Sequence, residues 1–355
     1  MIEKWATETG TQNYFKWISI DSSKQRKFDG LTVSALGAGT HLGLSDDATD
    51  RLYEETLIKA GVGGVNFFDT AIHYRNQRSE KLLKKVIKDL AARGTARDQL
   101  VIATKGGYIP FEGAELKARY LDTGVIEEKE VICGNYCMSP SFLENQIHSS
   151  LKNMGLEAID LYYLQNPESA LSFLGEEAFY KQLQEVFILF EKKIQEKKIR
   201  RYGIASWDGF RRKESLQLEK ILKCAQAAGG EKHHFKAVQF PYNLIMLEAL
   251  KIKGQLVGSS KKTIFEAANA LGISILISSP LMQSKVRMIS KRFLEHLPKG
   301  ASAALQALEF VLSTPQVISA FCGMKRGEHW EENQTALFKP SWQELQWSKA
   351  CSQLF

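Results

Sequence analysis

Short apolar runs alternate with longer amphipathic stretches along the chain from Leu31 onward. Runs of roughly four to eight mostly β-branched or aromatic residues are typical of buried strands, and apolar residues spaced three and four apart are typical of helices. The predicted strands are Ala35–Ala38, Gly64–Phe68, Leu100–Thr104, Ile159–Leu164, Tyr202–Ser206, Ala237–Phe240, Ile273–Ser278 and Val317–Phe321. The predicted helices are Asp47–Ala60, Ser79–Ala92, Pro140–Met154, Glu176–Glu196, Glu214–Ala227, Lys261–Leu271, Ala301–Thr314 and Gly327–Ala336. Strands that are each followed by a helix predict an α/β fold, a closed parallel (β/α)8 TIM barrel, rather than an open sheet.

Two terminal segments lie outside this alternation. Residues 1–30 form a polar N-terminal extension that nevertheless holds the aromatic residues Trp5, Tyr14, Phe15 and Trp17. These side chains favour packing of the extension on the body of the protein, and a surface for a protein partner is the alternative. We therefore expect an extension over residues 1–30, a single barrel domain over residues 31–337 and a C-terminal tail over residues 338–355.

A long connection, Gly106–Ser139, follows the third predicted strand. Loops of this length in a compact domain are usually functional or disordered. This one is too apolar for disorder, since it holds Tyr108, Phe111, Tyr120, Tyr136 and Met138. It is predicted either to form a wall of a substrate pocket or to pack against the outside of the barrel.

Three predicted strands end at polar side chains: Asp69, Lys105 and Gln165, and Tyr74 follows Asp69 closely. In a parallel barrel the carboxyl ends of the strands meet at one face, which is where chemistry takes place. A free tyrosine has a pKa near 10. A neighbouring ammonium is expected to lower that pKa, and a carboxylate would keep the lysine charged. Asp69, Tyr74 and Lys105 therefore predict a tuned proton donor; an ordinary buried ion pair beside a core tyrosine is the alternative.

Composition excludes several other classes of function. The 355 residues carry a net charge of +7, and the densest basic stretch, Lys192–Arg201, closes a predicted helix, where cations usually face water. We therefore expect no nucleic-acid partner. Apolar runs stay short of the roughly 20 residues that span a membrane, and Met1–Gly30 lacks the apolar centre of a signal peptide. Five cysteines without zinc-like spacing predict a reducing cytoplasm and no metal site.

Six segments, in the right order, resemble the aldo-keto reductase superfamily from about Leu31 to Leu337. They are Asn66–Tyr74, Thr104–Gly107, Tyr202–Ser206, Val238–Asn243, Ser279–Leu281 and Gly323–Asn333. The resemblance implies a barrel that reduces the carbonyl group of a small molecule with NADPH and without a metal. It also implies that Tyr74 is the general acid, with Lys105 and Asp69 tuning it.

The resemblance further implies a set of cofactor-binding residues. Ser206 and Gln239 would hold the nicotinamide carboxamide, since hydroxyl and amide groups match its donor and acceptor. Trp207 stands where many members have Asn, and Ser278 stands where many have an aromatic ring. The remaining positions implied are Ser279 and Leu281 beside the cofactor, Lys325, Arg326 and His329 at a 2′-phosphate, and Glu332 and Asn333 at the adenine. The three basic residues favour NADP(H), because cations bind phosphate and NAD lacks that group.

Gln165 departs from the family, which normally has histidine at this position. Glutamine can donate a neutral hydrogen bond but cannot titrate or relay a proton. Within the family, steroid 5β-reductases carry Glu here, and potassium-channel β subunits carry Asn and turn over slowly while serving a partner. His73 is a poor substitute, because adjacent residues in a loop rarely point the same way.

Two functions of different classes follow from these residues. The first is a cytoplasmic NADPH-dependent oxidoreductase of aldehydes, ketones or quinones, slowed by Gln165, with Tyr74 as the acid. The alternative is a cofactor-binding regulatory protein that senses redox state with little catalysis. The retained trio of Asp69, Tyr74 and Lys105 favours the enzyme, because a protein without catalysis has little need of a tuned acid.

Overall fold

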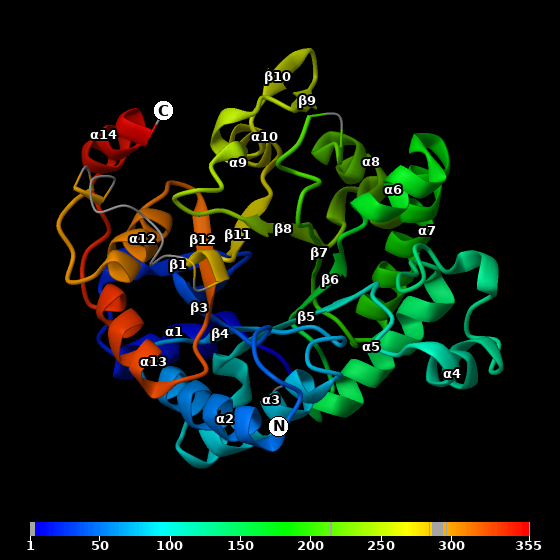
Figure 1. Ribbon diagram of the computed structural model, residues 1–355, viewed down its shortest axis with the longest axis horizontal. Helices are drawn as coiled ribbons and strands as arrows, with labels where there is room; N and C mark the ends of the chain where they lie inside the picture. The colour runs from blue at the N-terminus through cyan, green and yellow to red at the C-terminus, as the bar shows by residue number, and fades with distance from the viewer. Residues whose placement is uncertain (1–3, 214, 284, 286–293, 296, 355) are drawn as a thin grey trace.

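A closed barrel of eight parallel strands forms the centre of the computed structural model, as predicted (Figure 1). The structure describes residues 4–354 except 214, 284, 286–293 and 296. The barrel strands are β3 Leu36–Gly39, β4 Phe67–Asp69, β5 Val101–Gly106, β6 Leu161–Gln165, β7 Tyr202–Ala205, β8 Phe235–Pro241, β11 Ser274–Ser278 and β12 Val317–Gly323. β12 pairs with β3, which closes the barrel. The chain therefore has the (β/α)8 architecture that the alternation indicates.

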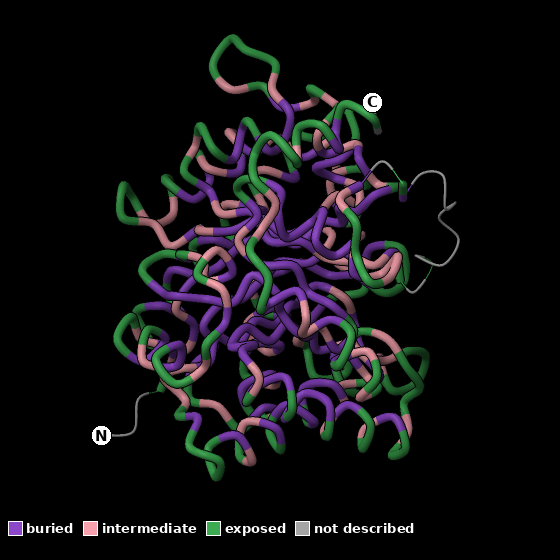
Figure 2. Tube along the Cα trace, turned by 90° about the vertical axis from the view of Figure 1, so that its left-hand side faces the viewer, coloured by how far each residue is buried: buried purple, intermediate pink, exposed green. Residues whose placement is uncertain are grey.

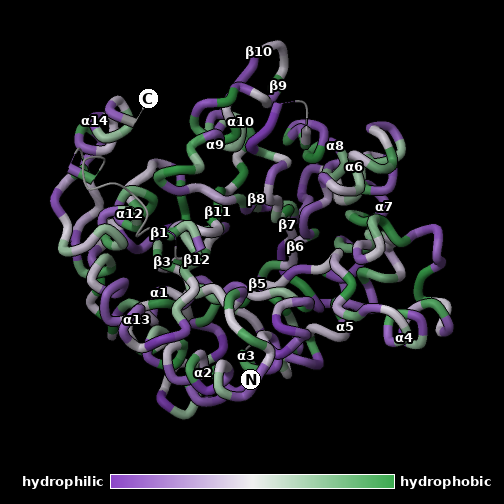
Figure 3. Tube along the Cα trace, viewed as in Figure 1, coloured by the Kyte–Doolittle hydropathy of each residue, from purple (hydrophilic) through white to green (hydrophobic). Residues whose placement is uncertain are grey.

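Helices surround the barrel in the order of the strands (Figure 1). They are α2 Asp47–Val62, α3 Arg78–Ala92, α5 Pro140–Met154, α7 Glu176–Gln195, α8 Leu218–Gly229, α10 Ile264–Leu271, α12 Ala303–Leu312 and α13 Gly327–Asn333. Hydropathy alternates along these helices, as expected where one face packs on a barrel and the other meets water (Figure 3). Among the described residues, no helix combines the length and apolar character needed to cross a membrane.

Two predicted helices begin three or four residues later than expected. Glu214 lies outside the described residues, and the helix predicted from it begins at Leu218. The helix predicted from Lys261 begins at Ile264, because Gln255–Val257 (β9) and Ser260–Lys262 (β10) pair as an antiparallel hairpin. Thr263 then caps α10, where its side chain accepts a hydrogen bond from the backbone N–H of Glu266 at 3.2 Å.

Shorter elements fill the margins of the barrel. They are α1 Glu8–Trp17, β1 Gln25–Phe28, β2 Leu31–Ser34, α4 Gly113–Leu116, α6 Glu168–Leu174, α9 Glu248–Lys251 and α14 Glu344–Leu354. Strands β1 and β2 form an antiparallel hairpin. Phe28 of this hairpin stacks on Phe67, the first residue of β4, with ring centroids 5.7 Å apart. The hairpin therefore closes the amino-terminal end of the barrel, and the opposite end is left for chemistry. Figure 2 shows buried residues gathered in the middle of the molecule and exposed residues along its margins.

The N-terminal extension packs on the body of the protein. Tyr14 is buried and its hydroxyl donates to the Gly61 carbonyl at 2.6 Å. Lys24 is fully buried and its ammonium donates to Glu309 of α12 at 2.9 Å. Trp17 is the exception, with 87% of its surface exposed. Burying an aromatic ring and a paired charge ties this segment to two helices of the barrel.

The connection after β5 has a small apolar core of its own. Ile109, Tyr120, Ile126 and Cys137 cluster there with Phe142 of α5. Figure 1 shows this segment, with α4, at the outer edge of the molecule. Most of the loop therefore packs outside the barrel. Its first residues, in contrast, reach the mouth of the barrel, as described next.

Candidate active site

A cavity of about 640 Å³ opens at the carboxyl ends of the barrel strands. Nearly all of the residues predicted for the site line it: Asp69, Tyr74, Lys105, Gln165, Ser206, Trp207, Gln239, Ser278, Ser279, Leu281, Arg326, His329, Glu332 and Asn333. Lys325 does not line it, and its side chain extends toward Gly43. The closed topology thus gathers residues from all eight barrel strands and from α13 into one space, of a size typical of ligand pockets.

A buried ion pair lies at the base of the cavity. The Lys105 ammonium contacts the Asp69 carboxylate and donates to the Thr70 carbonyl at 2.9 Å. The other Asp69 oxygen accepts a hydrogen bond from the Gln239 amide at 3.0 Å. Burial raises the pKa of Asp69 and lowers that of Lys105, and their mutual contact opposes both shifts. The predicted partnership between Asp69 and Lys105 is present.

Tyr74 lies beside this pair, with its ring centroid 5.4 Å from the Lys105 ammonium. Burial and the nearby Asp69 carboxylate raise the pKa of Tyr74 well above its ordinary value, and Gln165 opposes the shift. The net shift is upward, so the prediction of a lowered pKa is wrong, although a neighbouring ammonium still favours a phenolate once one forms. The reason is that Asp69 offsets the ammonium charge and burial removes the water that would solvate a phenolate. Tyr74 therefore keeps its proton at neutral pH.

Two histidines flank Tyr74. The His73 ring lies 4.8 Å from the Tyr74 ring, and the His41 ring lies 4.6 Å away on a different loop. Both line the cavity, so the expectation that His73 would point elsewhere is wrong: a tight turn brings both neighbours to the mouth. Burial lowers the pKa of His73 to about 3 and also lowers that of His41. Both imidazoles are therefore neutral at pH 7.

Sequence reasoning missed His41 and underrated Tyr108. His41 follows β3 by two residues, so the rule applied to the other strand ends could have found it. The Tyr108 ring lies 4.9 Å from that of His73, and its hydroxyl accepts a hydrogen bond from Asn166 at 3.0 Å. Tyr108 is the part of the long connection that forms a wall of the cavity. These rings give the cavity an aromatic rim near Tyr74.

Gln165 ends β6 and is nearly buried, with 8% of its surface exposed. Its Oε1 atom is buried without a hydrogen-bond partner among the described residues. A buried polar atom without a partner is costly and often marks a place where a ligand or water binds. The amide therefore lies where a polar group of a bound molecule can meet it.

The residues predicted at the nicotinamide lie on, or directly after, the neighbouring strands β7, β8 and β11. The Ser206 hydroxyl accepts a hydrogen bond from the Gly209 N–H at 2.7 Å. Trp207 is partly exposed and follows directly. Ser279 has a φ of +54°, a left-handed conformation that an L-residue adopts at a cost, and its carbonyl accepts from Asn243 at 3.0 Å. These contacts fix the loops that follow β7 and β11.

Residues of α13 and the residue before it border the cavity. Arg326 is exposed at the start of this helix, and His329 lies within its first turn. Glu332 accepts a hydrogen bond from Ser302, the residue that caps α12, and Asn333 is buried. Cationic and polar side chains therefore gather where α13 borders the cavity. Among the described residues, no cluster of three or more His, Cys, Asp or Glu could hold a metal ion.

Known proteins resemble this chain in sequence and in fold. A protein of Schizosaccharomyces pombe is 26% identical to this chain over 329 residues, which cover 87% of this chain and 86% of that protein. Its provisional name is voltage-gated potassium channel subunit beta. Two solved structures share the fold. The holo form of an aldo-keto reductase from Bacillus halodurans has a TM-score of 0.65 and 19% identity, over 93% of this chain and 96% of that one. An aldo/keto reductase from Klebsiella pneumoniae in complex with NADP and acetate has a TM-score of 0.63 and 19% identity, over 93% and 94%.

The sequence model of the aldo/keto reductase family matches residues 35–351, nearly the whole chain. This span includes every barrel strand and the residues that line the cavity. The chain belongs to the aldo/keto reductase family.

Proposed function

We propose that the protein is an NADPH-dependent oxidoreductase that reduces aldehyde, ketone or quinone carbonyls. One observation carries the proposal: Tyr74, Lys105 and Asp69 lie together in a cavity, with the ammonium 5.4 Å from the phenol ring and in contact with the carboxylate. A protonated phenol next to a buried cation is suited to donate a proton and to stabilise the charge left behind.

The residues present fit NADP(H). The cavity volume of about 640 Å³ lies within the roughly 300–1,000 Å³ range of ligand pockets. Amide and hydroxyl groups of Gln239 and Ser206, which can bind a carboxamide, line the cavity, and so do Arg326 and His329, which can bind a phosphate. When bound, NADPH supplies a hydride at this site. The NADP complex of the Klebsiella pneumoniae relative supports the same assignment.

Tyr74 would act as the general acid. Its raised pKa keeps the phenol protonated until negative charge develops on the carbonyl oxygen, which then becomes a stronger base than a phenolate. The Lys105 ammonium would favour the resulting phenolate, and Asp69 would hold that ammonium in its charged form. The Gln165 amide would donate a hydrogen bond to the same oxygen, without a charge to contribute.

A second candidate function is regulatory, and two observations favour it. Gln165 replaces the family's histidine, and the Schizosaccharomyces pombe relative is named for a channel subunit. In that case the protein would bind NADP(H) and report its redox state to a partner, for which the exposed Trp17 of α1 offers a contact. All five cysteines are free thiols, which is consistent with a location in the reducing cytoplasm for either function.

Transfer of deuterium separates the two functions. The protein would be incubated with NADPH deuterated at nicotinamide C4 and an activated aldehyde such as 4-nitrobenzaldehyde, and the alcohol analysed by mass spectrometry. The enzyme function requires deuterium on the carbinol carbon with native protein and its loss with Tyr74→Phe. Tyr14→Phe, which removes a hydroxyl far from the cavity, is the control and should keep activity. Tight NADPH binding without a deuterated product would favour the regulatory function.

A further inference from the structure

The turn that carries Tyr74 has an unusual backbone. The three residues after it, Arg75, Asn76 and Gln77, all have positive φ values, of 50°, 52° and 66°. None is glycine, so each sits in a conformation that L-residues rarely adopt. Such a backbone persists only where surrounding contacts hold it, and it is concentrated at functional sites. The contacts that hold this turn therefore bear on the position of Tyr74.

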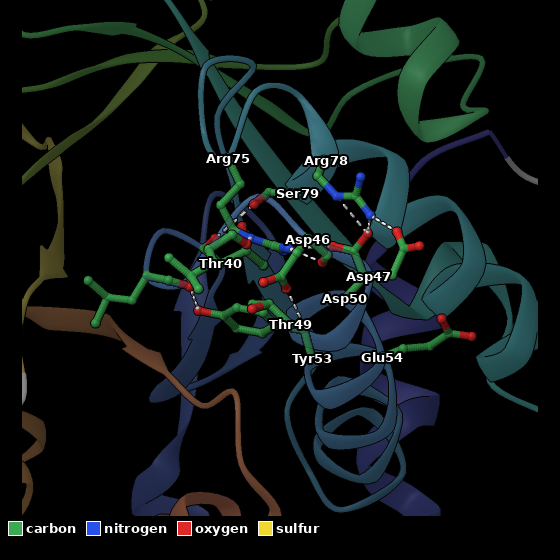
Figure 4. Close-up of polar contacts among 12 residues, drawn as sticks. Thr40, Asp46, Asp47, Thr49, Asp50, Tyr53, Glu54, Arg75, Arg78 and Ser79 are labelled. Carbon is green, nitrogen blue, oxygen red and sulfur yellow. Dashed lines mark hydrogen bonds and ion pairs between the residues drawn. The ribbon is translucent and has the colours of Figure 1, made fainter.

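The Arg75 side chain supplies those contacts, and Figure 4 shows it lying between the turn and α2. Its Nε donates to the Leu44 carbonyl at 2.8 Å and its Nη2 donates to the Asp46 carbonyl at 3.3 Å. The same Nη2 contacts the Asp50 carboxylate of α2. The Arg75 side chain is only 2% exposed, so the guanidinium is held by the protein and not by water.

The carbonyls that Arg75 binds belong to residues 40–46, the loop that follows β3, and His41 lies in this loop. At the cavity, the His41 and Tyr74 rings lie 4.6 Å apart. At the start of α3, Ser79 donates to the Thr40 carbonyl at 2.9 Å (Figure 4). The loop of residues 40–46 therefore contacts Tyr74 through His41, and it is also held by Arg75 and by Ser79 of α3.

Tyr53 of α2 extends the same arrangement. Its ring centroid lies 5.5 Å from the Arg75 guanidinium carbon, and its hydroxyl donates to the Leu42 carbonyl at 2.7 Å. Leu42, like His41, lines the cavity. A planar guanidinium that forms a fork of hydrogen bonds and lies over an aromatic ring has little freedom to move. One side chain therefore fixes two walls of the cavity relative to each other.

Arg78 offers a matched comparison. It also contacts Asp50, through the other carboxylate oxygen, with Nε at 2.9 Å, and it pairs with Asp47. Its side chain is 30% exposed, and among the described residues it donates no hydrogen bond to the carbonyls of residues 40–46. Arg78 thus shares the ion pair of Arg75 but not its contacts with the loop.

We propose that Arg75 is a positioning residue: it holds the turn that carries Tyr74 against the loop that carries His41, and so sets where the phenol meets the substrate oxygen. The proposal rests on the proposed function of Tyr74 as the acid. Arg75 does not line the cavity, so it would act through the backbone of residues 74–77. Its effect should fall on the rate of hydride transfer and not on cofactor binding, because the cofactor-binding residues lie on other loops.

The test compares Arg75→Met with Arg78→Met. Hydride transfer is followed as the decay of pre-bound NADPH fluorescence in a single turnover with 4-nitrobenzaldehyde, and NADPH affinity is measured by titration. We expect Arg75→Met to slow transfer by roughly tenfold to a hundredfold, the scale that displacements of about 1 Å produce. NADPH affinity should stay within about twofold, and Arg78→Met should keep both values within about twofold of the native protein, since the loop contacts remain.

An unchanged transfer rate in Arg75→Met would overturn the proposal, as would equal losses of rate in both variants. A crystal structure of each variant adds a readout that does not depend on activity. The Tyr74 ring should be displaced relative to Lys105 in Arg75→Met and unmoved in Arg78→Met. If the native protein transfers no hydride, the proposed function fails, and the crystal structures still decide whether Arg75 positions Tyr74. An unmoved Tyr74 ring in Arg75→Met overturns the proposal in every case.

Discussion

Replacing Lys105 with Met would leave the Asp69 carboxylate buried without a cation. The Lys105 and Asp69 side chains are 1% and 7% exposed, so water screens their charges very little. The Thr70 carbonyl would also lose its 2.9 Å hydrogen bond. Among the described residues, the Gln239 amide would then be the remaining hydrogen-bond donor to the Asp69 side chain. Breaking a buried ion pair on one side costs about 3–5 kcal/mol, and we expect a loss of stability of this size.

Urea unfolding followed by tryptophan fluorescence measures this loss. The double variant Lys105→Met with Asp69→Asn removes the unpaired charge while keeping an oxygen for the Gln239 amide. We expect the double variant to recover most of the stability, to within roughly 1–2 kcal/mol of the native protein. Lys129→Met, which breaks an exposed pair with Glu127, should leave the unfolding midpoint unchanged.

The loss should also depend on pH. Burial raises the pKa of Asp69 above its unfolded value of 3.8, and without Lys105 no cation among the described residues contacts Asp69 to oppose that shift. The folded variant therefore binds a proton that the unfolded chain has released, so its stability falls as pH rises from about 3.8 through the folded pKa. A loss below about 1 kcal/mol at pH 7, or a double variant no more stable than the single one, would refute this reasoning.

Three further predictions concern other parts of the protein. Gln165→His should speed single-turnover hydride transfer about tenfold or more, because an imidazole is a stronger donor to the developing charge; an equal or slower rate would contradict this role. Arg326→Ala should weaken NADPH binding by roughly tenfold and leave NADH binding unchanged in fluorescence titrations, since only NADPH carries the 2′-phosphate. Tyr14→Ala should cost about 3–5 kcal/mol in urea unfolding, because a buried ring is lost; a negligible cost would show that the extension is not part of the fold.

Most of the barrel could be predicted because its strands are buried on both sides and so form continuous apolar runs. The predicted Leu100–Thr104 corresponds to β5, Val101–Gly106. Gly64–Phe68 corresponds to the shorter β4, Phe67–Asp69, because Gly64 has a φ of +114° and lies in the approach to the strand. The ends of the predicted strands then indicated where the cavity lies, because the carboxyl ends of parallel strands meet at one face of a barrel.

What could not be predicted depends on contacts between distant parts of the chain. The pKa of Tyr74 follows from its burial, which no local pattern reveals. The contacts of Arg75 join a turn to a loop about 30 residues earlier in the chain. In the sequence alone, nothing distinguishes this arginine from an ordinary surface charge. The outward course of the connection after β5 likewise depends on its cluster with Phe142 of α5, which periodicity does not show.

Decay of pre-bound NADPH fluorescence in a single turnover with an activated quinone tests the central claim most directly. Native protein and Tyr74→Phe would be compared at equal occupancy, established beforehand by titration. We predict that native protein shows decay and that Tyr74→Phe shows none on the same timescale, because the variant lacks the proton donor of the cavity. Bound NADPH that decays in neither protein, or at equal rates in both, would contradict the assignment of Tyr74 as the acid of a carbonyl reductase.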